Sequence, residues 1–219
     1  HTAHNRLPVF ARRAAPVQVT WLGYGATTGL PQMDYRLTDS LADPDGAEDW
    51  WTEALWRLPG GFLCYAPPKS PLPESRIAGP VTFGSFNHLS KMNPGVIALW
   101  ARVLNAVPAS RLMLKARQLA DPDVGLRMRE AFATHGVEPS RLEFAARTAS
   151  RDDHLALYGK VDIALDTFPY NGATTSCEAL WMGTPVVTLA GERSTERYGV
   201  SLLTQAGCGE WIAETPDDF

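Results

Sequence analysis

Six polar side chains, widely spaced along the sequence, have the chemistry needed to bind a phosphorylated nucleoside. Two cations could neutralise phosphate groups, and two hydroxyls could donate hydrogen bonds to them. An imidazole could pack against a flat ring, and a carboxylate could accept hydrogen bonds from ribose hydroxyls. These residues are Lys91, Arg151, His154, Thr174, Thr175 and Glu178. They form one site only if the fold brings separate parts of the chain together.

The two threonines lie at the predicted start of a helix. An apolar run at 161–165 is typical of a buried parallel strand, and the loop after it contains Pro169 and Gly172, which interrupt regular structure. A helix is predicted between this loop and the next strand, 186–189. The start of such a helix offers free backbone N–H groups and the positive end of the helix dipole, which together bind phosphate.

Each of these residues also has a purely structural interpretation. Thr175 and Glu178 fit the capping-box spacing, in which the two residues satisfy unpaired backbone groups at a helix start. Lys91 could be a solvated surface lysine, Arg151 part of an ordinary charged first turn, and His154 a packing or capping residue. Taken singly, these interpretations are favoured. Taken together, at equivalent strand ends, the residues favour a binding site.

The elements that must position them alternate regularly from residue 81 onward. Strands are predicted at 81–86, 111–115, 141–144, 161–165 and 186–189, and helices at 94–107, 122–135, 151–158, 178–182 and 194–206. This order predicts a doubly wound parallel sheet with right-handed crossovers. The candidate residues follow the first, third and fourth strands, and ligands of such sheets bind at the carboxyl ends of the strands.

Before residue 81 the chain has a different composition. Strands are predicted at 17–22 and 34–39, a short helix at 47–52 and an extended segment at 54–58, with a glycine-rich loop at 23–29. Five prolines between residues 65 and 80 exclude a helix or a central strand there. We therefore predict a first domain portion at 1–65, a linker at 66–80 and a nucleotide-binding domain at 81–219.

Composition and short motifs exclude several classes of protein. The net charge of −4 argues against a nucleic-acid binder, and no apolar stretch is long enough to span a bilayer. Three widely spaced cysteines predict reduced thiols in a cytoplasmic protein. The GxxxxGK[ST] and GxGxxG phosphate-binding motifs are both absent. The sequences at 43–45 and 121–123 are Asp-Pro-Asp, which resembles a metal-binding DxD but is also typical of turns and helix caps.

Several longer motifs, in the same order, resemble the catalytic region of the protein O-GlcNAc transferases, a family that includes plant SPINDLY-type and bacterial members. The matching segments are 13–24, 27–29, 33–35, 83–94, 166–178 and 180–188. They extend over nearly the whole chain. The resemblance implies part of a two-Rossmann-domain (GT-B) inverting glycosyltransferase that moves N-acetylglucosamine from UDP-GlcNAc to Ser or Thr hydroxyls of proteins, without a metal or other cofactor.

The resemblance also assigns roles. Lys91 is expected to neutralise the diphosphate as the catalytic residue, and Thr174 and Thr175 to bind it. His154 is expected to stack on uracil, and Glu178 to bind the ribose. The further donor-binding residues that it implies are His88, Ala149, Arg151, Asn171, Gly172 and Ala173, with Gly23, Thr27 and Thr28 in a sugar-pocket loop.

The sequence departs from the family pattern at three of these positions. His88 and Ala173 stand where the family commonly has Gln and His, and Glu178 stands where it can have Asp. These differences are expected to affect donor preference and turnover more than nucleotide binding. The rest of the first domain and acceptor-holding tetratricopeptide repeats are expected upstream, so this chain is expected to need them for catalysis. A transferase using UDP-glucose or another donor, one that modifies Asn, and a non-catalytic nucleotide-sugar scaffold remain alternatives.

Overall fold

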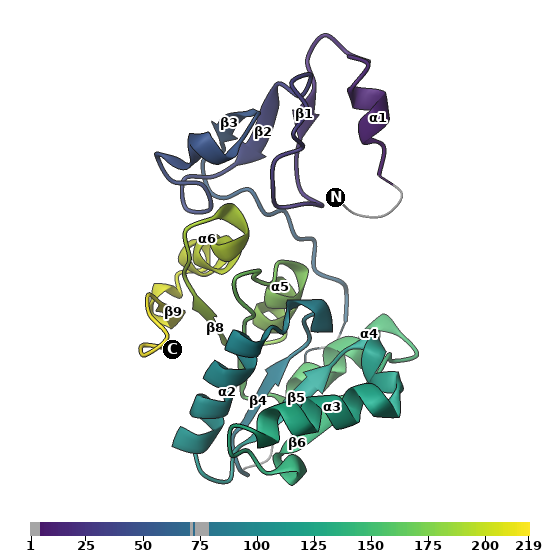
Figure 1. Cartoon of the computed structure of the whole chain (residues 1–219), viewed down its shortest axis with the longest axis vertical. Coiled ribbons are helices and arrows are strands. Elements are labelled where there is room, and N and C mark those ends of the chain that lie inside the picture. Colours follow the sequence, from purple (N-terminus) through teal and green to yellow (C-terminus); the bar gives the residue numbers. More distant parts are fainter. Residues whose placement is uncertain (1–4, 71, 73–78) are drawn as a thin grey trace.

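The computed structural model describes residues 5–70, 72 and 79–219, which form two parallel sheets (Figure 1). The smaller sheet has the order β1-β2-β3, with β1 at Val19–Thr20, β2 at Tyr35–Thr38 and β3 at Ala54–Arg57. It follows a short helix, α1 (Leu7–Phe10). The strand predicted at 17–22 is shorter than expected because Leu22 and Gly23 both have positive φ, which turns the chain away from the sheet.

The larger sheet has six parallel strands in the order β6-β5-β4-β7-β8-β9. Their bounds are β4 Thr82–Ser85, β5 Arg111–Lys115, β6 Leu142–Ala145, β7 Ile163–Leu165, β8 Val186–Leu189 and β9 Ile212–Ala213. The strand order reverses between β4 and β7. This order is that of the doubly wound nucleotide-binding fold, in which ligands bind at the reversal point.

Five helices connect these strands. They are α2 Pro94–Ala106, α3 Pro122–Ala133, α4 Arg151–Ala156, α5 Thr174–Trp181 and α6 Tyr198–Gln205. Short 3-10 turns occupy Ala47–Trp50, Leu89–Lys91, Arg117–Ala120, Pro139–Arg141, Leu157–Lys160, Ser194–Glu196 and Gly209–Trp211. The prediction of a single helix at 194–206 is wrong, because Arg197, with φ −125° and ψ 7°, is not helical and separates the turn from α6. The helix predicted at 47–52 is likewise only a 3-10 turn.

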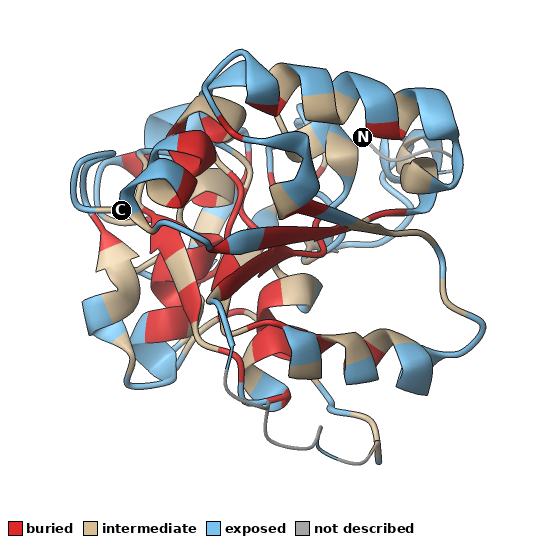
Figure 2. Ribbon diagram, turned by 90° about the horizontal axis from the view of Figure 1, so that it is seen from below, coloured by how far each residue is buried: buried red, intermediate tan, exposed pale blue. Residues whose placement is uncertain are grey.

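Two hydrophobic clusters pack on the six-stranded sheet, whose strands form the buried centre of the molecule in Figure 2. One contains Trp100 of α2 and Phe132 of α3, which are both fully buried. The other contains Leu155 of α4, Met182 just after α5 and Leu203 of α6. Because helices are anchored on both faces, the loops at the strand ends are held in fixed positions.

Helix α6 lies between the two sheets (Figure 1) and joins them through buried polar contacts. Ser201 Oγ donates to Asp39 Oδ2 (2.6 Å), and Ser194 Oγ, on the turn before α6, donates to Asp43 Oδ2 (3.0 Å). Arg197 Nε donates to the carbonyl of Leu41 (2.8 Å). The predicted linker carries no helix or strand in its described part, and residues 71 and 73–78 of it lie outside the described residues.

Candidate functional site

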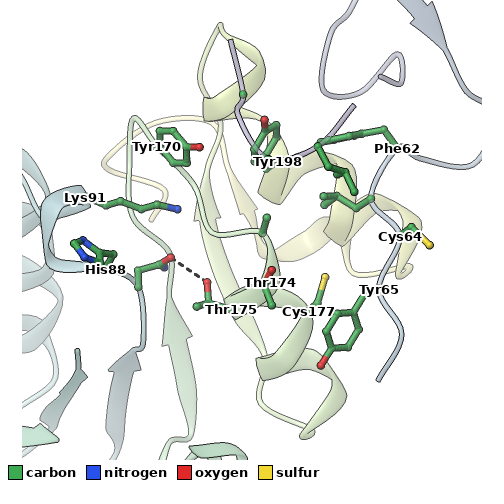
Figure 3. Close-up of a pocket in the computed structure, with 16 residues that line it drawn as sticks. Phe62, Cys64, Tyr65, His88, Lys91, Tyr170, Thr174, Thr175, Cys177 and Tyr198 are labelled. Atoms are coloured by element: carbon green, nitrogen blue, oxygen red, sulfur yellow. Dashed lines mark hydrogen bonds between the residues drawn. The ribbon is translucent and has the colours of Figure 1, made fainter. Parts of the chain in front are cut away.

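A cavity of about 390 Å³ lies at the carboxyl ends of the strands, where the order of the large sheet reverses (Figure 3). Both parts of the chain contribute to its walls. The lining residues from the first part are Leu22, Gly23, Gly25, Phe62, Leu63, Cys64 and Tyr65, and those from the second are Asn87, His88, Lys91, Tyr170, Ala173, Thr174, Thr175, Cys177 and Tyr198. The cavity therefore has the position predicted for a ligand of a doubly wound sheet.

The start of α5 forms one wall of the cavity. Helix α5 begins at Thr174, and its N-cap, Ala173, provides no side-chain hydrogen bond. Thr175 Oγ1 instead donates to Asn87 Oδ1 (2.9 Å), at the end of β4, so the capping-box interpretation of Thr175 is wrong. The first backbone N–H groups of α5 have no side-chain cap, which suits the binding of an anion.

Lys91 provides a positive charge at the opposite side of the cavity (Figure 3). Its Nζ donates to the carbonyl of Asn171 (2.7 Å) and lies 4.2 Å from the centre of the Tyr170 ring. Burial lowers the pKa of Lys91, while the negative charge of Asp166 raises it. Lys91 is thus not a solvated surface lysine, since its ammonium is held at the cavity before any ligand binds.

Asp166, which follows β7, organises the loop beneath Lys91. The carboxylate is fully buried and accepts hydrogen bonds from the backbone of Gly172 (2.7 Å) and Thr167 (2.9 Å), and from Thr188 Oγ1 (3.0 Å). Burial raises its pKa to about 6, although these hydrogen bonds oppose the rise. Sequence reasoning gave Asp166 no role; its position directly after a buried strand was the available signal.

His154 and Glu178 meet each other instead of lining the cavity. His154 Nε2 and Glu178 Oε2 are 2.9 Å apart, and Arg151 lies 3.9 Å from the same carboxylate. The imidazole packs near the rings of Phe86 (5.7 Å) and Tyr158 (5.9 Å). These contacts fit the packing interpretation of His154, while its stacking on uracil stays a prediction.

Of the remaining predicted site residues, some line the cavity and others do not. His88, Ala173 and Gly23 line the cavity, whereas Ala149 is exposed and does not. Asn171 is fully buried, where its Nδ2 donates to the carbonyl of Thr167 (2.9 Å). Asn171 and Gly172 therefore shape the loop under Lys91 and do not line the cavity.

Only part of the predicted sugar-pocket loop reaches the cavity. Thr27 Oγ1 donates to Glu53 Oε2 (2.7 Å), and the backbone N–H of Thr28 donates to Glu53 Oε1 (2.7 Å). These contacts keep both threonines away from the cavity, while Gly23 and Gly25 line it. A side chain at Gly25 would collide with Tyr198, so glycine is needed for the loop to approach α6.

Aromatic residues on the remaining walls were missed by sequence reasoning. Phe62 and Tyr65 come from the segment before the prolines, and Tyr170 and Tyr198 from the large domain (Figure 3). Burial raises the pKa of Tyr198 to about 12, so its hydroxyl stays protonated. Cys177 likewise stays a neutral thiol, with a pKa raised to about 11 by burial. No pattern in the sequence connected these rings, which come from distant segments.

The two Asp-Pro-Asp sequences have structural roles. Asp121 caps α3 by accepting from the backbone of Asp123 (2.9 Å), and Asp43 is buried at the contact with Ser194. Within residues 5–70, 72 and 79–219, no three His, Cys, Asp or Glu side chains are grouped as metal ligands. Over the same ranges, no helix is long and apolar enough to cross a membrane.

The fold is an α/β arrangement of two parallel sheets, with a cavity at the position where doubly wound sheets bind their ligands. The model for glycosyl transferase family 41 matches residues 1–66 and 69–219, so the chain belongs to this family. The prediction from the sequence motifs is therefore confirmed.

Two plant relatives and one solved structure show the extent of the similarity. Proteins named probable UDP-N-acetylglucosamine–peptide N-acetylglucosaminyltransferase SPINDLY, from Oryza sativa subsp. japonica and Arabidopsis thaliana, are 46% and 47% identical over the full chain, which spans 24% of each relative. A mutant O-GlcNAc transferase from Thermobaculum terrenum is 45% identical with a TM-score of 0.93, over 97% of this chain and 41% of that one. The predicted GT-B fold is confirmed, and this chain carries part of it.

Proposed function

We propose that this chain forms the donor-binding part of an inverting transferase that moves N-acetylglucosamine from UDP-GlcNAc to Ser or Thr hydroxyls of proteins. The observation that carries the proposal is a cavity at the reversal point of the sheet, with Lys91 on one side and the start of α5 on the other. The names of the relatives, which are UDP-N-acetylglucosamine–peptide N-acetylglucosaminyltransferases, support the donor and the acceptor class.

In the proposed reaction, an acceptor hydroxyl oxygen attacks the anomeric carbon of the sugar from the face opposite UDP. The bond between that carbon and the diphosphate oxygen breaks, UDP leaves with the electron pair, and the proton of the attacking hydroxyl is released to water. Negative charge then grows on the diphosphate, where the Lys91 ammonium and the N–H groups of α5 stabilise it. Because both are fixed before the reaction, they stabilise the transition state without reorganising. We propose that these groups do this work without a metal or other cofactor.

The proposal includes partners that lie outside this chain. The acceptor protein is a separate partner. The longer protein is expected to contain the remainder of the first domain and tetratricopeptide repeats, since the chain spans 24% of its plant relatives. Free Cys64, Cys177 and Cys208 support a cytoplasmic location, because reducing compartments keep thiols unpaired. No contact with nucleic acid or membrane forms part of the proposal.

Calorimetry with UDP tests the nucleotide site directly on this chain. We expect Lys91→Met to weaken UDP binding by roughly tenfold or more, since a charge-assisted contact to phosphate is lost. Lys69→Met removes an equal charge from an exposed position outside the cavity and should leave the affinity unchanged. If UDP fails to bind, or binds both variants equally, the site is wrongly assigned.

A transfer assay on the full-length protein separates the alternatives. Radiolabel from UDP-GlcNAc, but not from UDP-glucose, should appear on Ser or Thr of an acceptor peptide. Label from UDP-glucose, or on Asn, would identify a related transferase. Tight UDP binding without any transfer would identify a non-catalytic scaffold.

A further inference from the structure

One peptide group connects the two buried charges of the site. The carbonyl of Asn171 accepts a hydrogen bond from Lys91 Nζ (2.7 Å), and the N–H of Gly172, in the same peptide group, donates to Asp166 Oδ1 (2.7 Å). In a trans peptide the carbonyl and N–H point in opposite directions. The dipole of this group is therefore aligned between cation and anion and stabilises both.

The remaining partners of the two charges are neutral. Asp166 also accepts from the Thr167 backbone, the Thr188 hydroxyl and, more weakly, Asn87 Nδ2 (3.3 Å). Lys91 also faces the Tyr170 ring, and in the described part of the chain Asp166 forms no direct ion pair. The Lys91 charge lowers the pKa of Asp166, and the Asp166 charge raises the pKa of Lys91.

The same carboxylate is linked to the phosphate-facing helix. Asn87 donates to Asp166 through Nδ2 and accepts from Thr175 through Oδ1 (2.9 Å). The buried anion is thus hydrogen-bonded to one residue that holds the start of α5 and to the peptide that holds Lys91. Both sides of the cavity depend on it.

We propose that Asp166 is a positioning residue for Lys91, which acts through the Asn171–Gly172 peptide to hold the ammonium charged and fixed at the cavity. The ligand that uses this ammonium follows from the proposed function, but the coupling between the two side chains is a property of the free protein. Without this counter-charge, burial would lower the pKa of Lys91 further, toward the neutral amine, which binds phosphate poorly.

Titration of the Asp166 carboxyl group by ¹³C NMR tests the coupling without any ligand. In the wild-type chain we expect a midpoint near the pKa of about 6. Lys91→Met should raise this midpoint by roughly one pH unit, because an opposite charge nearby has been removed. Lys115→Met is the matched control, since Lys115 is also partly buried and interacts with Glu178, not Asp166. An unchanged midpoint in Lys91→Met would overturn the proposal.

The reverse measurement uses Asp166→Asn, which keeps the shape of the side chain and removes its charge. Acylation of Lys91 at a fixed pH, followed by mass spectrometry, reports the neutral amine. We expect roughly threefold to tenfold faster labelling, which corresponds to a pKa of Lys91 lower by about half to one unit. Thr188→Val removes one hydrogen bond from the same carboxylate but leaves it ionised at a labelling pH of about 9, so it should not change the labelling rate there. If both variants lower the melting temperature but neither changes the labelling rate, Asp166 is only structural.

UDP calorimetry on Asp166→Asn then connects the coupling to the ligand. Weaker binding in Asp166→Asn, together with faster labelling, supports the full proposal, whereas wild-type affinity would contradict the positioning role. If wild-type protein does not bind UDP but the NMR and labelling shifts appear, the proposed function fails while the coupling of Lys91 and Asp166 stands.

Discussion

Replacement of Asp166 by Asn should change how the stability of the protein depends on pH. The carboxylate is fully buried after β7, and its hydrogen bonds do not fully compensate for the lost hydration. In Asp166→Asn, Oδ1 can still accept from Gly172 and Thr167, and the new amide can donate to Thr188 Oγ1. The substitution therefore removes the charge while it keeps the local contacts.

The magnitude follows from the pKa of this one group. Burial raises the pKa of Asp166 from 3.8 to about 6, so between these values the folded state binds more protons than the unfolded state. The protonated Asp166 carboxyl makes its full contribution to stability below pH 3.8, and this contribution is lost as the pH rises to 6. A shift of about 2 units corresponds to roughly 3 kcal/mol. The wild-type protein should lose this free energy of unfolding across the window, and the variant should not.

Urea unfolding at several pH values between about 4 and 7 measures this difference. The free energy of unfolding of Asp166→Asn minus that of the wild type should rise with pH and level off above pH 6. Glu48 and Glu53, whose pKa values are lowered by hydrogen bonds, have the opposite dependence but are common to both proteins. A difference that stays flat, or that falls as pH rises, would refute the argument from burial.

Three further substitutions test the walls of the cavity and the contact between the two sheets. Gly25→Ala should reduce the melting temperature and the affinity for UDP, because the added methyl group collides with Tyr198; unchanged values in both assays would show that the loop can relax. Ser201→Ala leaves the buried Asp39 carboxylate with one hydrogen bond fewer and should cost about 1–3 kcal/mol in urea unfolding. Thr204→Ala, on the exposed side of α6, should change stability by less than about 0.5 kcal/mol, and equal losses would contradict the role of the contact. Thr175→Val should weaken UDP binding by roughly tenfold in calorimetry, since Asn87 loses its partner, and full affinity would argue against this contact.

The large domain could be predicted well because its signals are local. The apolar strands at 111–115 and 186–189 have the predicted bounds, and α2 begins at Pro94 as proline at a first helical position indicates. Placement of Lys91 and Thr174 at one cavity followed from the rule for parallel strand ends. These features depend on periodicity and topology, which a sequence carries directly.

Contacts with partners far along the chain could not be predicted from the sequence. The stacking of His154 on a base stays a prediction, but its contact with Glu178, from another helix, was not foreseen. The break before α6 occurs where Ser194 and Arg197 contact Asp43 and Leu41, in the segment after β2. The role of Asp166 depends on a peptide turned toward Lys91. Only the folded chain brings these groups together.

The walls of the cavity come from both sides of the proline-rich segment, with Phe62 and Tyr65 from before it and Lys91 and Thr174 from after it. A molecule bound there would touch both parts at once and act as a non-covalent crosslink between them. Its binding energy would then oppose separation of the sheets, so heat resistance should rise with the logarithm of ligand concentration. Ligand binding in the cavity and the stability of the contact between the two sheets are therefore thermodynamically linked.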